Sequence, residues 1–214
     1  MEEQMQIFEP TKKSANLVLV AITVLAFFVV QFWEKSITEG AFYGHTTEFL
    51  LEHGALHGPS ILQGEWYRLV THMFLHGDIW HLGNNMLILF CLGNALEHYV
   101  GRIPYVLVYF LSGILAGLGS VVYNTTGTVS VGASGAVFGV VGAMAWLVLQ
   151  NRGRLEGFTG SRMIVFILLS VYAGFADRGI DNAAHVAGLI AGFFLAVLLC
   201  RKKPVVSDET EDFL

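Results

Sequence analysis

Charged residues are scarce in this sequence, and several classes of protein are excluded by what it has little of. Only 14% of the 214 residues are Asp, Glu, Lys or Arg, whereas soluble domains carry about 25%. The net charge of -5 comes largely from the two ends of the chain, and no basic face suited to nucleic acid is present. Cys91 and Cys200 both lie in apolar runs, which predicts two buried thiols and no disulfide framework.

Long apolar runs are what the sequence has instead. A membrane-spanning helix needs about 20 apolar residues, and six segments come close to that length: 16–33, 79–97, 103–123, 134–150, 163–176 and 183–200. The fifth is short and the fourth begins with small residues, so we expect both in the interior of a bundle. The pattern predicts an all-α, polytopic membrane protein with six transmembrane helices.

The segment 34–71, between the first two apolar runs, is too polar to span a membrane. Its scattered aromatic and aliphatic residues, such as Phe42 and Trp66, predict a loop that rests at the membrane interface. The first run ends in Trp33, Glu34 and Lys35 and has no small-residue cleavage site, so we interpret it as a transmembrane helix and not as a signal peptide. We expect a cytoplasmic segment 1–15, one membrane domain 16–200 and an acidic tail 201–214.

The placement of Lys and Arg predicts the orientation in the membrane, because cytoplasmic loops are enriched in both. With both termini in the cytoplasm, three of the 12 Lys and Arg lie outside and the other nine lie inside. The outside residues are Lys35, Arg68 and Arg178, and the inside residues are Lys12, Lys13, Arg102, Arg152, Arg154, Arg162, Arg201, Lys202 and Lys203. We expect a multi-pass protein of a prokaryotic plasma membrane.

Three polar clusters fall at the first turns of the second, fourth and sixth predicted helices. All three helices run from outside to inside, so their first turns lie at a similar depth. Polar groups inside a membrane are costly and usually face the bundle interior or a water-filled cavity. One wet pocket near the outer face is therefore predicted, lined by His81, Asn84, Asn85, Ser134, Asn182 and His185.

The run Gly132-Ala133-Ser134-Gly135 opens the fourth helix. Its glycines allow a tight loop, and Ser134 can expose its hydroxyl next to backbone N–H groups that have no intrahelical partner. Such donors can stabilise an oxyanion. The alternative is that the small residues serve only close helix packing.

A glycine face flanks His185 on the sixth helix. Gly188 and Gly192 share one face with the histidine, and the fourth helix offers the matching small residues Gly135, Gly139 and Gly142. Close contact of these helices would bring His185 within hydrogen-bond reach of Ser134, as a nucleophile and its base require. The alternative is a histidine that only hydrogen-bonds between helices.

His81 and Asn85 lie one turn apart on the second helix, and both can donate hydrogen bonds towards a developing negative charge. A metal site is the rival interpretation, since His72 and His76 have i, i+4 spacing. The HExxH pattern of zinc proteases is absent, however. We expect no metal, and we interpret His72 and His76 as structural hydrogen-bonding residues.

With these motifs in this order, the sequence resembles the rhomboid family of intramembrane serine proteases along nearly its whole transmembrane length. The matching residues are Trp66-Tyr67-Arg68, His76, His81, Asn85, Leu92-Gly93-Asn94-Ala95-Leu96-Glu97, Gly132-Ala133-Ser134-Gly135 and Ala184-His185-Val186-Ala187-Gly188. Each piece is modest alone, but their joint order and spacing are highly specific.

The resemblance implies a Ser134–His185 dyad, with an oxyanion site made of the Ser134 N–H and the side chains of His81 and Asn85. It also suggests structural roles for Arg68 and Glu97, and packing support for the dyad from Gly132, Gly135, Gly188 and Phe138. Phe138 stands where many rhomboids have tyrosine, and we expect its ring to pack under the His185 imidazole. Asp181 lies four residues before His185 and is interpreted as a helix cap, not as a third catalytic residue.

The resemblance further implies an endopeptidase that acts in the lipid bilayer on single-pass membrane proteins, near the outer face, without metal or organic cofactor. Two alternatives belong to other classes. A catalytically inactive rhomboid-like protein that binds membrane clients would be expected to lack the serine or the histidine. A small transporter or channel would have no reason to pair a Gly132–Gly135 type of helix start with His185 on a glycine face.

Overall fold

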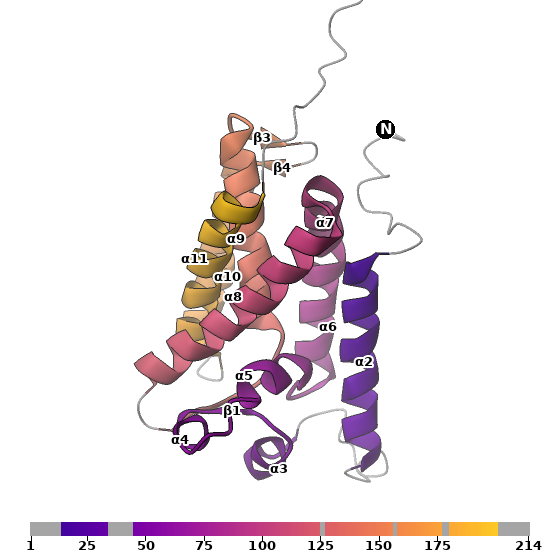
Figure 1. Ribbon diagram of the computed structural model, residues 1–214, viewed down its shortest axis with the longest axis vertical. Coiled ribbons are helices and arrows are strands. Elements are labelled where there is room, and N and C mark those ends of the chain that lie inside the picture. Colours follow the sequence, from indigo (N-terminus) through magenta and orange to yellow (C-terminus); the bar gives the residue numbers. More distant parts are fainter. Residues whose placement is uncertain (1–13, 34–44, 125–126, 156–157, 177–179, 201–214) are drawn as a thin grey trace, which may run out of the picture.

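Helices dominate the computed structural model, which describes residues 14–33, 45–124, 127–155, 158–176 and 180–200. The six apolar segments all fall on helices. These are α2 (Ala15–Trp33), the continuous run of α6 (Ile79–Ile88), the π-helix η4 (Leu89–Gly93) and α7 (Asn94–Val100), then α8 (Arg102–Tyr123), α9 (Ser134–Gln150), α10 (Gly160–Ala176) and α11 (Asn182–Leu199). Figure 1 shows them as one elongated bundle.

Three of these helices are long and apolar enough to cross a membrane: Ile79–Val100, Arg102–Tyr123 and Asn182–Leu199. Ala15–Val30 and Ser134–Gln150 are shorter apolar helices. Many of the large apolar side chains on the outer surface of the bundle are exposed, as lipid-facing residues are, including Ile103, Val122 and Leu198. The chain is therefore an integral membrane protein with several apolar helices.

Helix α9 forms the centre of the bundle and packs against both α8 and α11, which also contact each other. Its residues from Gly135 to Met144 are all buried, because small and apolar residues occupy every face of the helix. The prediction that this segment lies in the interior is confirmed.

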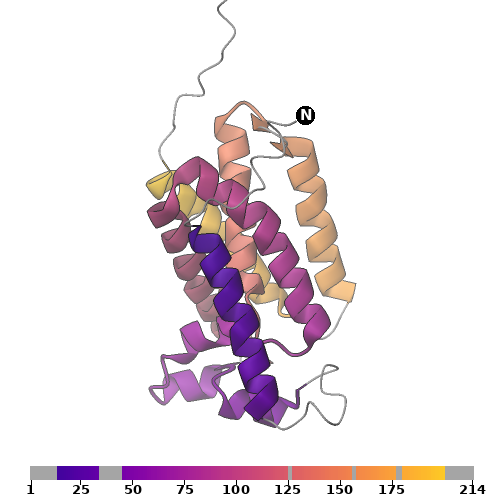
Figure 2. The same cartoon turned by 90° about the vertical axis from the view of Figure 1, so that its right-hand side faces the viewer.

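The same prediction was wrong for α10. This helix begins at Gly160, three residues before the predicted segment, and stands at the edge of the bundle in Figure 2. Its Ile164, Val165 and Leu168 are all more than half exposed. Segment length was no guide to burial, because α9 and α10 both have 17 residues.

A layer of short elements covers the end of the bundle where α6, α9 and α11 begin (Figure 1). It contains α3 (Thr47–Glu52), α4 (Gly58–Leu62), α5 (Arg68–Thr71) and the 3-10 helix η3 (His72–Phe74), and strand β1 (Leu56–His57) pairs antiparallel with β2 (Val129–Ser130). Arg68 holds the layer together, since its guanidinium donates to the carbonyls of Leu51 at 2.7 Å and Ala55 at 2.8 Å.

The opposite end carries the hairpin of β3 (Arg154–Leu155) and β4 (Phe158–Thr159) and a polar network around Glu97. Glu97 caps α2 by accepting hydrogen bonds from the Ser14 hydroxyl at 2.6 Å and from the N–H groups of Ala15 and Asn16. The Asn16 amide in turn donates to the Leu89 carbonyl at 3.0 Å, at the start of the π-helix. The expected structural roles of Arg68 and Glu97 agree with these contacts.

The two cysteines are free, as expected, but only one is fully buried. Cys200 is 3% exposed, whereas Cys91 is partly exposed. The prediction of a buried Cys91 was wrong, because this residue is not among the buried residues of the π-helix, which are Leu89 and Gly93.

Candidate active site

Two polar side chains from separate helices meet near the end of the bundle that carries the α3–α5 layer. Ser134 is the first residue of α9, and His185 lies in the first turn of α11. The Nε2 atom of His185 lies 2.9 Å from the Oγ atom of Ser134, which is hydrogen-bond distance. His185 is only 8% exposed. A neutral imidazole placed in this way can accept the proton of the hydroxyl.

A glycine-lined contact between α9 and α11 explains why the two side chains can meet. A Cβ atom on Gly188 would lie 3.0 Å from the carbonyl carbon of Gly135, and one on Gly192 would lie 2.5 Å from the Cα of Gly139. Since these positions have no room for a side chain, the two backbones are in contact. The predicted pairing of the glycine faces is confirmed.

The His185 ring is held by stacking. The Phe138 and His185 ring centroids are 4.3 Å apart with 14° between the planes, as expected from the sequence. The Nδ1 atom of His185 has no hydrogen-bond partner among the described residues. Asp181 instead caps α11 by accepting from the Ala184 N–H at 3.0 Å, so its interpretation as a cap is confirmed. The geometry is that of a serine–histidine pair.

The loop before Ser134 depends on the glycine at 132. Gly132 has a φ of +120°, a conformation that glycine adopts far more easily than other residues. Its N–H donates to the His72 carbonyl at 2.9 Å, and a Cβ atom there would lie 2.7 Å from Nε2 of His81. Gly132 therefore turns the chain into α9 and lets the His81 ring approach the backbone beside Ser134.

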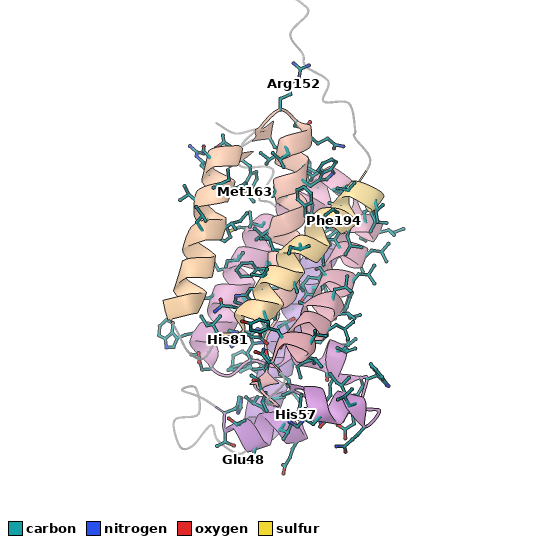
Figure 3. All side chains as sticks on the ribbon, turned by 90° about the vertical axis from the view of Figure 1, so that its left-hand side faces the viewer. Glu48, His57, His81, Arg152, Met163 and Phe194 are labelled. Atoms are coloured by element: carbon teal, nitrogen blue, oxygen red, sulfur yellow. The ribbon has the colours of Figure 1, made fainter. Side chains whose placement is uncertain are left out.

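His81 and Asn85 lie on α6, next to this loop. Asp78 caps the helix by accepting from the His81 N–H at 2.8 Å. Asn85 donates one of its two amide hydrogens to the His81 carbonyl at 2.9 Å, so one donor remains outside that bond. Figure 3 shows His81 towards the same end as His57 and far from Arg152. The structure thus brings both residues to the end of the bundle that holds Ser134.

His76 contacts the loop before Ser134 through its ring, and His72 contacts it through its backbone carbonyl. The Ala133 N–H points at Nε2 of His76 at 3.4 Å, next to the bond from Gly132 to the His72 carbonyl. Burial lowers the pKa of His72 to about 4 and that of His76 to about 3, so both rings are neutral near pH 7. No group of three or more His, Cys, Asp or Glu able to hold a metal occurs among the described residues.

One feature near His185 was not predicted. The Asp181 carboxylate also accepts hydrogen bonds from the Ser120 hydroxyl and, at 3.2 Å, from the Asn124 amide, both at the end of α8. Ser120 and Asn124 lie one turn apart, which gave a weak sign of a polar face. Nothing local in the sequence indicated that this face would meet the start of α11.

Comparison with known proteins agrees with this geometry. Residues 63–202 match the Rhomboid domain. The chain is 37% identical over 193 residues to rhomboid protease GluP of Bacillus subtilis, an alignment that covers 90% of this chain and 36% of GluP. It is 39% identical over 144 residues to the putative rhomboid protease YdcA of the same organism, covering 67% of this chain and 72% of YdcA.

A more distant relative is rhomboid-like protease 1 of Toxoplasma gondii, 32% identical over 167 residues, which cover 73% of this chain and 56% of that protein. The chain spans about a third of the length of GluP and about half of the Toxoplasma protein. The domain match covers most of the chain, and it includes both Ser134 and His185. On this evidence the chain belongs to the rhomboid family.

Proposed function

We propose that this chain is an intramembrane serine endopeptidase that cleaves transmembrane segments of membrane proteins near the outer membrane face. The observation that carries the proposal is the 2.9 Å contact between His185 Nε2 and Ser134 Oγ. His185 takes the hydroxyl proton as Oγ attacks the scissile carbonyl, and then delivers it to the leaving amine. The same imidazole then deprotonates a water molecule that attacks the acyl-enzyme, and it returns this proton to Ser134 Oγ as the ester bond breaks.

The negative charge on the attacked carbonyl oxygen needs donors near Ser134. The Ser134 N–H stands at the first position of α9, where an N–H has no intrahelical acceptor. The His81 ring approaches the backbone at Gly132, and Asn85 follows one turn later on α6. We assign these three groups to the oxyanion site, where loss of one donor typically lowers the rate by about 10²–10³-fold.

Four further residues are assigned to the support of this site. Gly132 keeps the space for the His81 ring, Phe138 stacks on the imidazole, and the Gly135–Gly188 contact holds the two helices together. None of them carries a group that could transfer a proton. Their substitution should act through the position of Ser134 and His185.

The membrane arrangement that suits this chemistry has six spans within 16–200 and both termini, 1–15 and 201–214, in the cytoplasm of a prokaryotic cell. Helices α6, α9 and α11 all begin at the end that carries α3–α5 (Figure 1). The opposite end carries the exposed Arg152 (Figure 3), as the enrichment of cytoplasmic loops in Lys and Arg requires. Leu62 and Trp66, 81% and 59% exposed, suit a first loop that rests on the outer interface.

The proposed substrates are single-pass membrane proteins. A peptide bond inside a helix is wrapped by its own hydrogen bonds, so a substrate must unwind before Ser134 can reach its carbonyl. Substrates with Gly or Pro near the cleavage site should therefore be preferred. The names of the Bacillus and Toxoplasma relatives, which are called proteases, are consistent with this class of activity.

The test is cleavage of a single-pass substrate with a Gly/Pro-weakened helix, in liposomes, by the wild type, Ser134→Ala and His185→Ala. A fluorophosphonate probe run in parallel reports whether Ser134 is activated. Ser161→Ala is the matched control, because Ser161 is exposed at the far end of the bundle on α10.

Ser134→Ala and His185→Ala should both lose substrate cleavage and fluorophosphonate labelling, while Ser161→Ala should keep both. Cleavage that persists in Ser134→Ala would show that another group is the nucleophile. A wild type that neither cuts nor reacts would favour the alternative of an inactive, client-binding member of the family.

A further inference from the structure

The carboxylate of Asp181 joins the first turn of α11 to the last turn of α8. It accepts three hydrogen bonds: one from the Ser120 hydroxyl, one from the Asn124 amide at 3.2 Å and one from the Ala184 N–H at 3.0 Å. The Asn124 amide also donates to the Ser120 hydroxyl at 3.2 Å. A cap needs only the Ala184 bond, so the two bonds to α8 call for a further explanation.

This carboxylate does not complete a triad. A third catalytic residue would accept a hydrogen bond from Nδ1 of His185, and that atom has no partner among the described residues. Asp181 reaches the histidine through the backbone instead, because the His185 N–H donates to the Asp181 carbonyl at 3.1 Å. Any influence on His185 must therefore act through the helix turn or through charge.

Both routes matter at this position. His185 sits in the first turn of α11, where the helix dipole is positive and disfavours a cation. When the imidazole takes the Ser134 proton it becomes a cation, so a fixed negative charge at the N-cap offsets the dipole. Of the described ionisable side chains, Asp181 and, from α6, His81 interact with His185 electrostatically. The residues of α8 and α9 that approach this part of α11, among them Ala116, Gly119 and Ser134, are neutral.

The α8 helix is also a suitable anchor. Ala116 of α8 contacts both helices that carry the pair, with its Cβ 2.6 Å from a Cβ on Gly135 and 3.4 Å from one on Gly188. Ser120 follows one turn later on the same face. A bond from Ser120 to Asp181 therefore fixes the start of α11 against a helix that contacts both α9 and α11.

We propose that Asp181 is a positioning residue for the reaction, which holds the first turn of α11 against α8 and supplies the negative charge that stabilises protonated His185. This inference rests on the function proposed for Ser134 and His185. It predicts that the charge and the anchor can be separated by mutation. Asp181→Asn removes the charge but keeps a side chain that caps helices equally well, whereas Ser120→Ala removes the anchor and keeps the charge.

The experiment measures kcat and KM for the same liposome substrate between pH 5 and 9, with thermal unfolding of each variant. Asp181→Asn should unfold near the wild-type temperature, keep KM within about twofold and lose about 3–10-fold in kcat. The acidic limb of its kcat–pH profile should move to lower pH by about 0.5–1 unit, because protonated His185 loses the anion that stabilises it. Ser120→Ala should lower kcat without moving that limb.

Two controls make the outcome decisive. Asp181→Ala removes cap and charge together, so it should show the same shifted limb with a lower unfolding temperature. An Asp181→Asn enzyme with a wild-type pH profile and kcat would overturn the inference and leave Asp181 as a simple cap. If Asp181→Asn does not fold, a Ser120→Ala enzyme with wild-type kcat would overturn the anchoring role. Absence of Ser134-dependent labelling in the wild type would refute the proposed function itself.

Discussion

A methyl group added at Gly188 is the sharpest probe of how α9 and α11 set the serine–histidine distance. In Gly188→Ala the new Cβ would overlap the Gly135 carbonyl oxygen and would lie 3.0 Å from its carbon, both backbone atoms that no rotamer change can move. The two helices must then separate by roughly 1 Å, and the 2.9 Å contact of His185 with Ser134 opens with them.

A displacement of that size typically costs about 100-fold in rate. Overpacking should also lower the free energy of unfolding by about 1–3 kcal/mol, although alanine is by itself the better helix former by about 1 kcal/mol. The assay is kcat/KM on the liposome substrate, with thermal unfolding to establish that the variant is folded. Loss of activity in a folded protein is the expected result.

Gly83→Ala is the matched control. Gly83 lies on α6, and a Cβ there would meet nothing within 4 Å, so the same substitution should leave cleavage unchanged. The reasoning is refuted if Gly188→Ala folds and cuts within about threefold of the wild type. It is also refuted if Gly83→Ala loses as much activity as Gly188→Ala, because the effect would then come from helix propensity and not from the contact.

Three further predictions concern the supports of the fold and of the pair. Glu97→Ala removes three hydrogen bonds at the start of α2 and should lower the free energy of unfolding by about 2–4 kcal/mol; an unchanged unfolding temperature would contradict this role. Phe138→Tyr should cut within about threefold of the wild type, whereas Phe138→Ala, which removes the ring stacked on His185, should lose about tenfold or more in kcat; equal activity in the two variants would argue against the stacking role. Burial lowers the pKa of His72 to about 4, so between pH 6.5 and 4 the unfolded chain binds more protons than the folded chain. The free energy of unfolding should therefore fall by roughly 3 kcal/mol in total as the pH falls through this range. His72→Gln should flatten the dependence of unfolding temperature on pH, and an equally steep dependence in that variant would assign it to other groups.

The amino-acid sequence alone determined the class of the protein and the identity of its candidate pair. Low charge and six apolar runs required lipid as the solvent, because a chain with so few charged residues cannot shield six apolar helices from water. Polar residues at three helix starts predicted one pocket near the outer face, because polar groups are costly inside a membrane. The resemblance to the rhomboid family then implied that Ser134 and His185 form the pair in this pocket. The glycine spacing on two of those helices predicted their contact, because a close approach of two backbones excludes side chains.

The tertiary structure alone decided how those groups are held. The sequence did not indicate that Asp181 would reach Ser120 on α8, that Glu97 would cap α2, or that β1 would pair with the strand before Ser134. The sequence also led us to expect the fifth apolar segment in the bundle interior, whereas α10 lies at the edge of the bundle. The physical reason is the same in each case. A local pattern shows that a donor, an acceptor or an apolar face must be satisfied, but the partner lies tens of residues away, and only the packing of the helices selects it.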